Sequence, residues 1–240
     1  MPYALITGAN KGIGYEAAHL MLQAGYFVFL GCRDAAKGQQ AQQQLHAAGF
    51  DQVLAIELDV TSDQSVQQAV EAVRRRTTQL DALLNNAGIA SELTQQPSTI
   101  ALDALRTVLE TNYFGVVRTT QAFLPLLRLA PQPRIVNVSS TLGSLTLQSD
   151  PSWVYYPAKA VAYCSSKTML NAWTVFLAYE LRDTPLKVNA VNPGYTATDL
   201  NGHSGPNTAA HAAQVVVKYA LLPPDGPTGQ FFSEDGPSPW

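Results

Sequence analysis

A tyrosine and a lysine four residues apart are the first side chains in this sequence that could carry out acid–base chemistry. Tyr163 and Lys167 lie in a segment of helical periodicity, so both side chains should project from the same face of one helix. A tyrosine hydroxyl has an ordinary pKa of about 10, and a neighbouring ammonium favours the phenolate and lowers that value. Such a pair could donate and accept a proton near neutral pH. Chance pairs of this kind are common on helices, but Ser140, which follows an apolar strand, could bring a hydroxyl to the same place.

A glycine-rich segment occupies residues 7–14, between a predicted strand and a predicted helix. Glycine allows a tight turn and lets the backbone approach a pyrophosphate, whose charge then lies at the N-terminus of the helix. The spacing Gly-x3-Gly-x-Gly differs from the common Gly-x-Gly-x-x-Gly fingerprint, and Lys11 precedes the second glycine, which excludes a P-loop. The segment indicates a dinucleotide site, and a purely structural turn is the alternative.

The segment Asn85-Asn86-Ala87-Gly88 closes another predicted strand. A buried asparagine at this position could tie the ends of neighbouring strands together. The small residues Ala87 and Gly88 would also leave room for a cofactor ribose at the same edge of the sheet.

Short apolar runs alternate with longer segments of helical period along the whole chain, which predicts βαβ units. The expected fold is α/β, with one Rossmann-type doubly wound parallel sheet of about seven strands and helices on both faces. We find no linker and no internal repeat, so residues 1–240 are predicted to form one domain. The expected strands are 3–7, 26–32, 53–58, 82–85, 135–139, 187–191 and 230–233, and the expected helices are 13–23, 34–48, 64–78, 102–129, 160–182 and 208–222.

Composition excludes several classes of protein. Apolar residues make up 46% of the chain, which argues against disorder, and the net charge of −3 argues against a nucleic-acid partner. No apolar stretch reaches the roughly 20 residues of a membrane helix. Two cysteines cannot form a disulfide framework, and the four histidines lack ligand spacing, so no metal is expected. The N-terminus lacks a charged leader, which predicts a cytoplasmic protein.

Together these segments resemble the short-chain dehydrogenase/reductase family, and within it the carbonyl reductase branch. The branch is indicated by Asn10-Lys11, by Cys32-Arg33-Asp34 and by the tail from Leu222 to Glu234. The resemblance implies NADPH-dependent reduction of an aldehyde, ketone or quinone. The family landmarks run nearly from end to end: Thr7–Gly14, Asp59-Val60, Asn85–Gly88, Asn112, Ser140, Tyr163 with Lys167, and Asn192-Pro193-Gly194 followed by Thr198.

The resemblance also implies a role for each catalytic residue. Tyr163 would protonate the carbonyl oxygen, Lys167 would hold the ribose and lower the Tyr163 pKa, and Ser140 rather than Ser139 would bind the substrate oxygen. Asn112 would position a water molecule that links Lys167 to solvent, or would simply bond a nearby carbonyl inside a helix. The residues expected to bind the cofactor are Gly8, Asn10, Lys11, Gly12, Ile13, Gly14, Arg33, Asp59, Val60, Asn86, Ala87, Gly88, Tyr163, Lys167, Pro193, Gly194, Thr196 and Thr198.

The end of the second predicted strand indicates which coenzyme is used. NAD-specific sites place a carboxylate there to accept a hydrogen bond from the ribose 2′-hydroxyl. This chain has Cys32 followed by Arg33, and Lys11 should reach the same place from the glycine loop. Two cations suit a 2′-phosphate. Asp34 is the exception, and we expect it to cap the helix that begins there.

Residues 141–162 separate the two halves of the predicted catalytic set and contain many apolar side chains. Trp153 and Tyr156 in this insert are expected to line the substrate pocket, or else to cover the core. An insert folded over the outer face of the catalytic helix would block self-association there, which favours a monomer over a homo-oligomer. The conformations of 90–100, 141–162 and 195–206 cannot be derived from the sequence.

Two other functions fit the same residues less well. An NAD(P)-dependent alcohol or hydroxysteroid dehydrogenase would use the same set in the oxidative direction. A dinucleotide-sensing protein without catalysis would have no need of Ser140, Tyr163 and Lys167 together.

Overall fold

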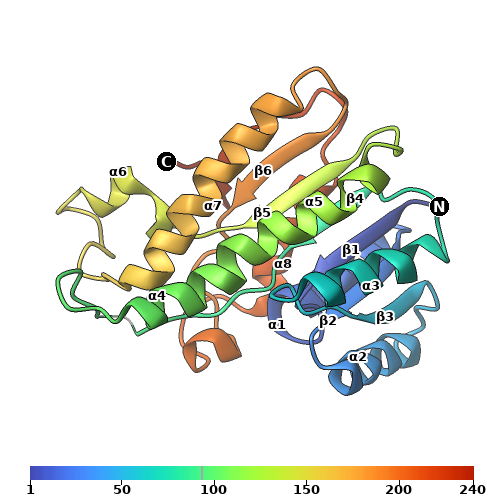
Figure 1. The fold of residues 1–240 in the computed structure, drawn as a ribbon, viewed down its shortest axis with the longest axis horizontal. Helices are drawn as coiled ribbons and strands as arrows, with labels where there is room; N and C mark the ends of the chain where they lie inside the picture. The colour runs from blue at the N-terminus through green and yellow to red at the C-terminus, as the bar shows by residue number, and fades with distance from the viewer. Residues whose placement is uncertain (93) are drawn as a thin grey trace.

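One eight-stranded sheet forms the centre of the computed structural model, which describes residues 1–92 and 94–240 (Figure 1). The strand order is β3-β2-β1-β4-β5-β6-β7-β8, and neighbouring strands are parallel except for β7 and β8. The chain changes direction across the sheet between β1 and β4, as in doubly wound α/β folds. The predicted fold class is therefore confirmed. The strands are β1 Tyr3–Thr7, β2 Phe27–Cys32, β3 Val53–Glu57, β4 Ala82–Asn85, β5 Arg134–Val138, β6 Lys187–Val191, β7 Phe231–Ser233 and β8 Gly236–Pro237.

Within the described residues, the strand β8 is the one addition to the predicted set of about seven. It contains two residues and pairs antiparallel with β7. A two-residue strand has no side-chain alternation, so hydrophobic patterning cannot reveal it.

Helices cover the two faces of the sheet in separate layers (Figure 1). One layer contains α3 (Asp63–Arg74), α4 (Leu102–Leu109), α5 (Gly115–Leu127) and α7 (Val161–Glu180); the other contains α1 (Gly12–Gln23), α2 (Ala35–Ala47) and α8 (Ala209–Ala220). Residues of β1 alternate between the two apolar cores: Ala4 and Ile6 face α1 and α8, and Leu5 faces the other layer. Because both faces are covered, the strands are nearly continuous apolar runs.

Side chains cap the start of α2, where the sequence predicted it, and the start of α3. Asp34 accepts a hydrogen bond from Lys37 N at 3.1 Å at the start of α2, and Ser62 accepts one from Ser65 N at 3.2 Å at the start of α3. Asp34 thus serves as an N-cap, as predicted. The backbone hydrogen bond from Lys37 lowers the pKa of the Asp34 carboxyl.

The predicted helix 102–129 is divided by a π turn, Glu110–Phe114, labelled η1, which lies between α4 and α5. Asn112 lies in this turn and is fully buried. Single π turns inside α-helices are frequent at functional sites. Apolar periodicity continues through the turn, so the break could not be predicted from the apolar pattern.

The predicted site residues gather at the carboxyl edge of the sheet. Asn10, Arg33, Asp59, Ala87, Ser140 and Gly194 lie in loops that follow six different parallel strands. Ligands of open α/β sheets bind at this edge, beside the point where the strand order reverses. The topology therefore brings together motifs that are far apart in the sequence.

Candidate active site

The glycine-rich loop joins β1 to α1 and has little space for side chains. Gly8 and Gly12 have φ values of +66° and +57°, a region that favours glycine. A Cβ atom on Gly14 would lie 2.5 Å from both the Gly8 carbonyl oxygen and Asn86 Nδ2. Lys11 is the N-cap of α1 and makes no side-chain cap hydrogen bond, so its side chain leaves the first N–H groups of the helix open to an anion.

Thr7 and Asn86 tie the glycine loop to the loop that follows β4. Thr7 Oγ1 accepts hydrogen bonds from the backbone N–H groups of Asn86 and Ala87, each at 2.9 Å. Asn86 Nδ2 donates to the carbonyls of Thr7 and Gly8 at 2.9 Å and 3.3 Å. The loops expected to bind the pyrophosphate and a ribose are therefore neighbours in the structure.

Asn85 ties neighbouring strands together, which is the structural role that the sequence suggested as one possibility. Its Nδ2 donates to Asn137 Oδ1 on β5 at 2.9 Å and to Thr120 Oγ1 on α5 at 3.0 Å. All three side chains are buried. Asn85 thus holds β4, β5 and α5 together below the site.

Ser140 and Tyr163 approach each other beyond the end of β5, where the Ser140 hydroxyl lies close enough to lower the pKa of the Tyr163 phenol. Ser139 is directed elsewhere: its Oγ donates to Asn171 Oδ1 on α7 at 2.6 Å, and the residue is only 2% exposed. The geometry therefore favours Ser140 over Ser139 as the serine that faces a substrate. Strand alternation alone could not make this choice.

Lys167 lies beneath Tyr163, with its Nζ 5.6 Å from the centroid of the Tyr163 ring. The ammonium donates a hydrogen bond to the Val138 carbonyl at 2.7 Å. Burial lowers the pKa of Lys167 to about 8. Burial also raises the pKa of Tyr163 to about 12, and the nearby Ser140 hydroxyl acts in the opposite direction.

The expected lowering of the Tyr163 pKa by Lys167 is not what this structure shows, because burial outweighs the other influences on the phenol. At neutral pH the Tyr163 hydroxyl is therefore protonated. A protonated phenol is the form that can donate a proton.

Asn112 holds the loop after β4 against α7. Its Oδ1 accepts from Ile89 N at 2.8 Å, and its Nδ2 donates to the Ile89 carbonyl at 2.9 Å and to Ser166 Oγ at 3.1 Å. Ser166 Oγ in turn donates to the Tyr163 carbonyl at 2.7 Å. These contacts match the alternative of a helix-interior asparagine that bonds a nearby carbonyl. The water relay to Lys167 stays a prediction.

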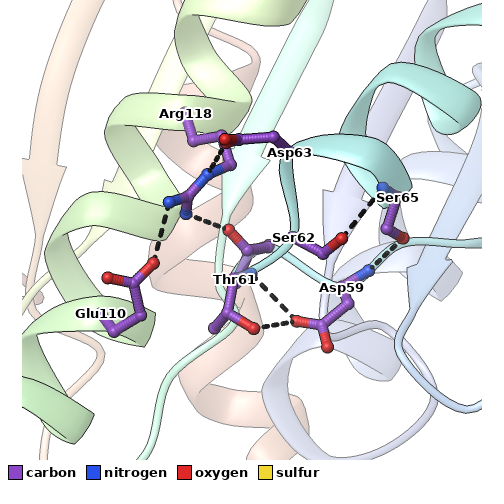
Figure 2. A network of polar contacts seen from close by, with 8 residues as sticks. Asp59, Thr61, Ser62, Asp63, Ser65, Glu110 and Arg118 are labelled. Atoms are coloured by element: carbon purple, nitrogen blue, oxygen red, sulfur yellow. Dashed lines mark hydrogen bonds and ion pairs between the residues drawn. The ribbon is translucent and has the colours of Figure 1, made fainter.

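Asp59 and Val60 lie in the loop between β3 and α3, which internal hydrogen bonds hold in place (Figure 2). Asp59 Oδ1 accepts from the Thr61 N–H at 2.9 Å and from Thr61 Oγ1 at 2.7 Å. Asp59 N donates to Ser65 Oγ at 2.9 Å. The Asp59 carboxylate therefore shapes the loop itself.

The end of β2 carries the predicted cation. Cys32 is buried, Arg33 is exposed, and Asp34 is engaged as the cap of α2. Lys11, the second predicted cation, forms an ion pair with Asp199, a residue that sequence reasoning did not single out. Asp199 begins η3 (Asp199–Asn201), so this ion pair joins the glycine loop to the loop after β6.

The loop after β6 approaches the glycine loop through Thr198. Thr198 Cγ2 lies 3.6 Å from the position that a Cβ atom on Gly12 would occupy. Thr196 Oγ1 donates to the Gly194 carbonyl at 3.1 Å, and Gly194 itself has a φ of +82°. The predicted cofactor residues from the two ends of the chain are thus adjacent.

The insert 141–162 packs along the N-terminal half of α7. Its first turn, η2 (Thr141–Gly143), lies so close that a Cβ atom on Gly143 would be 2.6 Å from Lys167 Cβ. The short helix α6 (Leu145–Gln148) lies at the N-terminal end of α7 (Figure 1). On the C-terminal half of α7, Phe176 and Tyr179 remain 67% and 68% exposed. The insert leaves the C-terminal half of α7 uncovered. The monomer was predicted because the insert was expected to cover this helix, and that reason does not apply to the C-terminal half.

Aromatic side chains connect the insert to the loop after β6. Trp153 packs edge-on against Tyr155, and Tyr155 packs edge-on against Tyr195, with ring centroids 5.5 Å and 6.2 Å apart. Tyr156 lies beneath Lys159 Nζ, 4.2 Å from its ring centroid. The contribution of Trp153 and Tyr156 to substrate binding stays a prediction.

Sequence reasoning missed the residues that cap α7. The Tyr163 N–H donates to Ser91 Oγ at 3.3 Å, and the Ala162 N–H donates to Gln95 Oε1 at 3.0 Å. Ala160, the N-cap by position, supplies no side-chain hydrogen bond. A cap from a distant loop leaves no local sequence signal, because capping patterns join residues within one turn.

Within residues 1–92 and 94–240, none of the helices combines the length and the apolar character that crossing a membrane requires. The same residues contain no group of three or more His, Cys, Asp or Glu side chains that could hold a metal ion.

Comparison with known proteins agrees with this geometry. A family model described as short chain dehydrogenase matches residues 2–209. (-)-Isopiperitenone reductase from Mentha piperita is 33% identical, over 97% of this chain and 96% of the relative. Salutaridine reductase from Papaver bracteatum is 31% identical, over 97% of this chain and 94% of the relative. The solved structure of NADPH-bound carbonyl reductase from chicken fatty liver has a TM-score of 0.86 and 29% identity, over 100% of this chain and 99% of that one.

Proposed function

The chain belongs to the short-chain dehydrogenase family of oxidoreductases, and from this premise we propose that it is an NADPH-dependent carbonyl reductase. The proposed substrate is a small aldehyde, ketone or quinone, which is converted to the alcohol. The reductase names of several relatives and the carbonyl reductase among the similar structures support this class of reaction.

The observation that carries the proposal is the meeting of Ser140, Tyr163 and Lys167 at the carboxyl edge of the sheet. Ser140 would hydrogen-bond the substrate oxygen, and Tyr163 would donate its proton to that oxygen as negative charge develops. The buried Tyr163 phenol is protonated at neutral pH, which is the form that can donate a proton to the substrate oxygen. Lys167 would hold the ribose hydroxyls near Tyr163.

The residues around this set fit a dinucleotide. The first turn of α1 and the positive φ values of Gly8 and Gly12 provide an open helix N-terminus for a pyrophosphate. The reduced nicotinamide supplies the hydride when bound. The residues proposed to hold the coenzyme are Gly8, Asn10, Lys11, Gly12, Ile13, Gly14, Arg33, Asp59, Val60, Asn86, Ala87, Gly88, Tyr163, Lys167, Pro193, Gly194, Thr196 and Thr198. Trp153 and Tyr156 are proposed to border the substrate.

A turnover assay tests the reaction directly. We expect the purified protein to oxidise NADPH in the presence of at least one member of a panel of cyclic ketones, aromatic aldehydes and quinones, measured as loss of absorbance of the reduced coenzyme. Tight NADPH binding without turnover of any compound would instead favour the sensing protein. Turnover confined to alcohols with the oxidised coenzyme would favour the oxidative dehydrogenase.

We expect NADPH to be strongly preferred over NADH, because Arg33 and Lys11 are cations and Asp34 is engaged as a helix cap. The double substitution Lys11→Ala, Arg33→Ala should reduce this preference by about 10- to 100-fold, as expected when charge-assisted hydrogen bonds to a 2′-phosphate are lost. The measurement is the ratio of kcat/KM for the two coenzymes. Arg106→Ala, on the exposed surface of α4, is the matched control. An unchanged ratio in the double variant would contradict the assignment.

A further inference from the structure

Arg118 connects three segments that are separate in the sequence (Figure 2). It lies on α5, and its Nη1 donates to the Val60 carbonyl at 2.7 Å. Its Nη2 donates to Glu110 Oε1 in the π turn at 2.8 Å, and its Nε forms an ion pair with Asp63 in the first turn of α3. The side chain is only 22% exposed. One guanidinium therefore fixes the loop after β3, the start of α3 and the π turn relative to one another.

The backbone of α5 reaches the same loop directly. A Cβ atom on Gly115 would lie 2.8 Å from Val60 Cγ2 and 3.2 Å from the Val60 carbonyl oxygen. Val60 is only 6% exposed. The absence of a side chain at Gly115 thus lets the loop pack against α5, and the Val60 carbonyl is turned toward that helix.

We propose that Arg118 is a positioning residue for the adenine half of the coenzyme, which it orients through Val60. The inference rests on the proposed function, in which Asp59 and Val60 hold the coenzyme; by the family resemblance, these two residues flank its adenine. Arg118 holds the Val60 carbonyl on the α5 side, and so fixes the orientation of the Val60–Thr61 peptide, whose N–H donates to Asp59 Oδ1. Arginine suits this role because its rigid, planar guanidinium can donate hydrogen bonds to several acceptors at once.

Loss of Arg118 would release the loop in two ways. The Val60 carbonyl would lose its charged donor, and the carboxylates of Asp63 and Glu110 would lose the cation between them. Asp59 would keep its own bonds to Thr61, so the turn would persist but would no longer be fixed against α5. The consequence should be weaker binding of the adenine half, with the groups around Tyr163 left in place.

The test is Arg118→Met, with dissociation constants measured by calorimetry for NADPH and for adenosine 2′,5′-bisphosphate, which contains only the adenine half. We expect both constants to rise by about tenfold, because the ligand must then order a loop that Arg118 no longer holds in place. At saturating NADPH, kcat should stay within about twofold of the unaltered protein, because the interaction is made equally in the ground and transition states. A merely structural defect would lower kcat as well.

Arg128→Met is the matched control, because Arg128 directly follows α5 and its ion pair with Glu180 is exposed and far from Val60. It should leave both constants unchanged. If Arg118→Met does not fold, Arg118→Lys serves instead: it keeps the charge but cannot reach all three acceptors, and both constants should still rise.

The outcomes separate the two proposals. Constants for Arg118→Met or Arg118→Lys that equal those of the unaltered protein, or a fall in kcat without a change in binding, would overturn the inference alone. Failure of the unaltered protein to bind NADPH would overturn the proposed function and this inference with it.

Discussion

Replacing Tyr163 with phenylalanine is expected to lower kcat/KM for carbonyl reduction by about 10²- to 10⁴-fold, the contribution typical of a positioned proton donor. The substitution removes the hydroxyl that meets Ser140 and leaves the ring in place. Neither Gly8 nor Gly14 of the glycine loop is altered, so NADPH binding should persist. Steady-state kinetics and coenzyme fluorescence on the same preparation measure the two effects separately.

Tyr179→Phe is the matched control, since it makes the same change on the same helix at a residue that is 68% exposed. It should retain full activity. Near-normal turnover by Tyr163→Phe would show that another group protonates the substrate, and the proposed mechanism would then be wrong. A loss of activity in both variants would point to α7 itself rather than to the Tyr163 hydroxyl.

The fold was predictable because its main signals are repeated many times along the chain. Each buried parallel strand is an apolar run, and each helix has an amphipathic or apolar face. Caps such as Asp34 and Ser62 mark where α2 and α3 begin. These patterns depend on residues that are close in sequence. The π turn at Glu110–Phe114 and the strand Gly236–Pro237 were missed because neither changes the local apolar pattern.

The candidate site was predictable only where its residues form recognisable local motifs. Gly8, Tyr163 and Lys167 were found in this way, because strand-to-helix turns and helix faces are set by local spacing. Arg118, Ser166 and Gln95 were not found, since each acts on a partner more than 50 residues away in the chain or through a loop of unknown conformation. Long-range polar contacts are decided by packing, which one sequence does not display.

The pKa shifts of Tyr163 and Lys167 also depend on packing that the sequence does not display. From spacing alone, Lys167 should lower the pKa of Tyr163, because a cation favours the phenolate. The structure shows that burial dominates at both residues and shifts the phenol pKa upward and the ammonium pKa downward. Depth below the surface cannot be judged from residue types, so the sign of the net effect on Tyr163 was not predictable.

Lys167→Met is expected to lower kcat/KM by at least about 10²-fold and at the same time to stabilise the fold at neutral pH. Methionine has a similar length and no charge, so it removes the cost of burying an ammonium that is 5% exposed. The lost hydrogen bond to the Val138 carbonyl offsets part of this gain, by roughly 1 kcal/mol. Activity falls because Lys167 no longer holds the ribose hydroxyls near Tyr163.

The direction of the Lys167 pKa shift determines how the stability of the folded protein changes with pH. Lys167 has a pKa of about 8 in the folded protein and 10.5 as its ordinary value. Below pH 8 the ammonium is present in both the folded and the unfolded chain, so the full cost of burying the charge lowers the free energy of unfolding. Between pH 8 and pH 10.5 the unfolded chain holds a proton that the folded protein has released. Stability therefore rises with pH across this interval, by about 3 kcal/mol in total.

Lys167→Met lacks this titration, so its stability advantage over the unaltered protein should be largest at pH 7 and should shrink steadily as the pH rises toward 10. Urea unfolding of both proteins at several pH values measures the difference, in which the titration of every other group cancels. Parallel stability curves for the two proteins would mean that Lys167 keeps an ordinary pKa in the fold. The ammonium would then be solvated rather than buried beneath Tyr163, and its place in the site would have to be reconsidered.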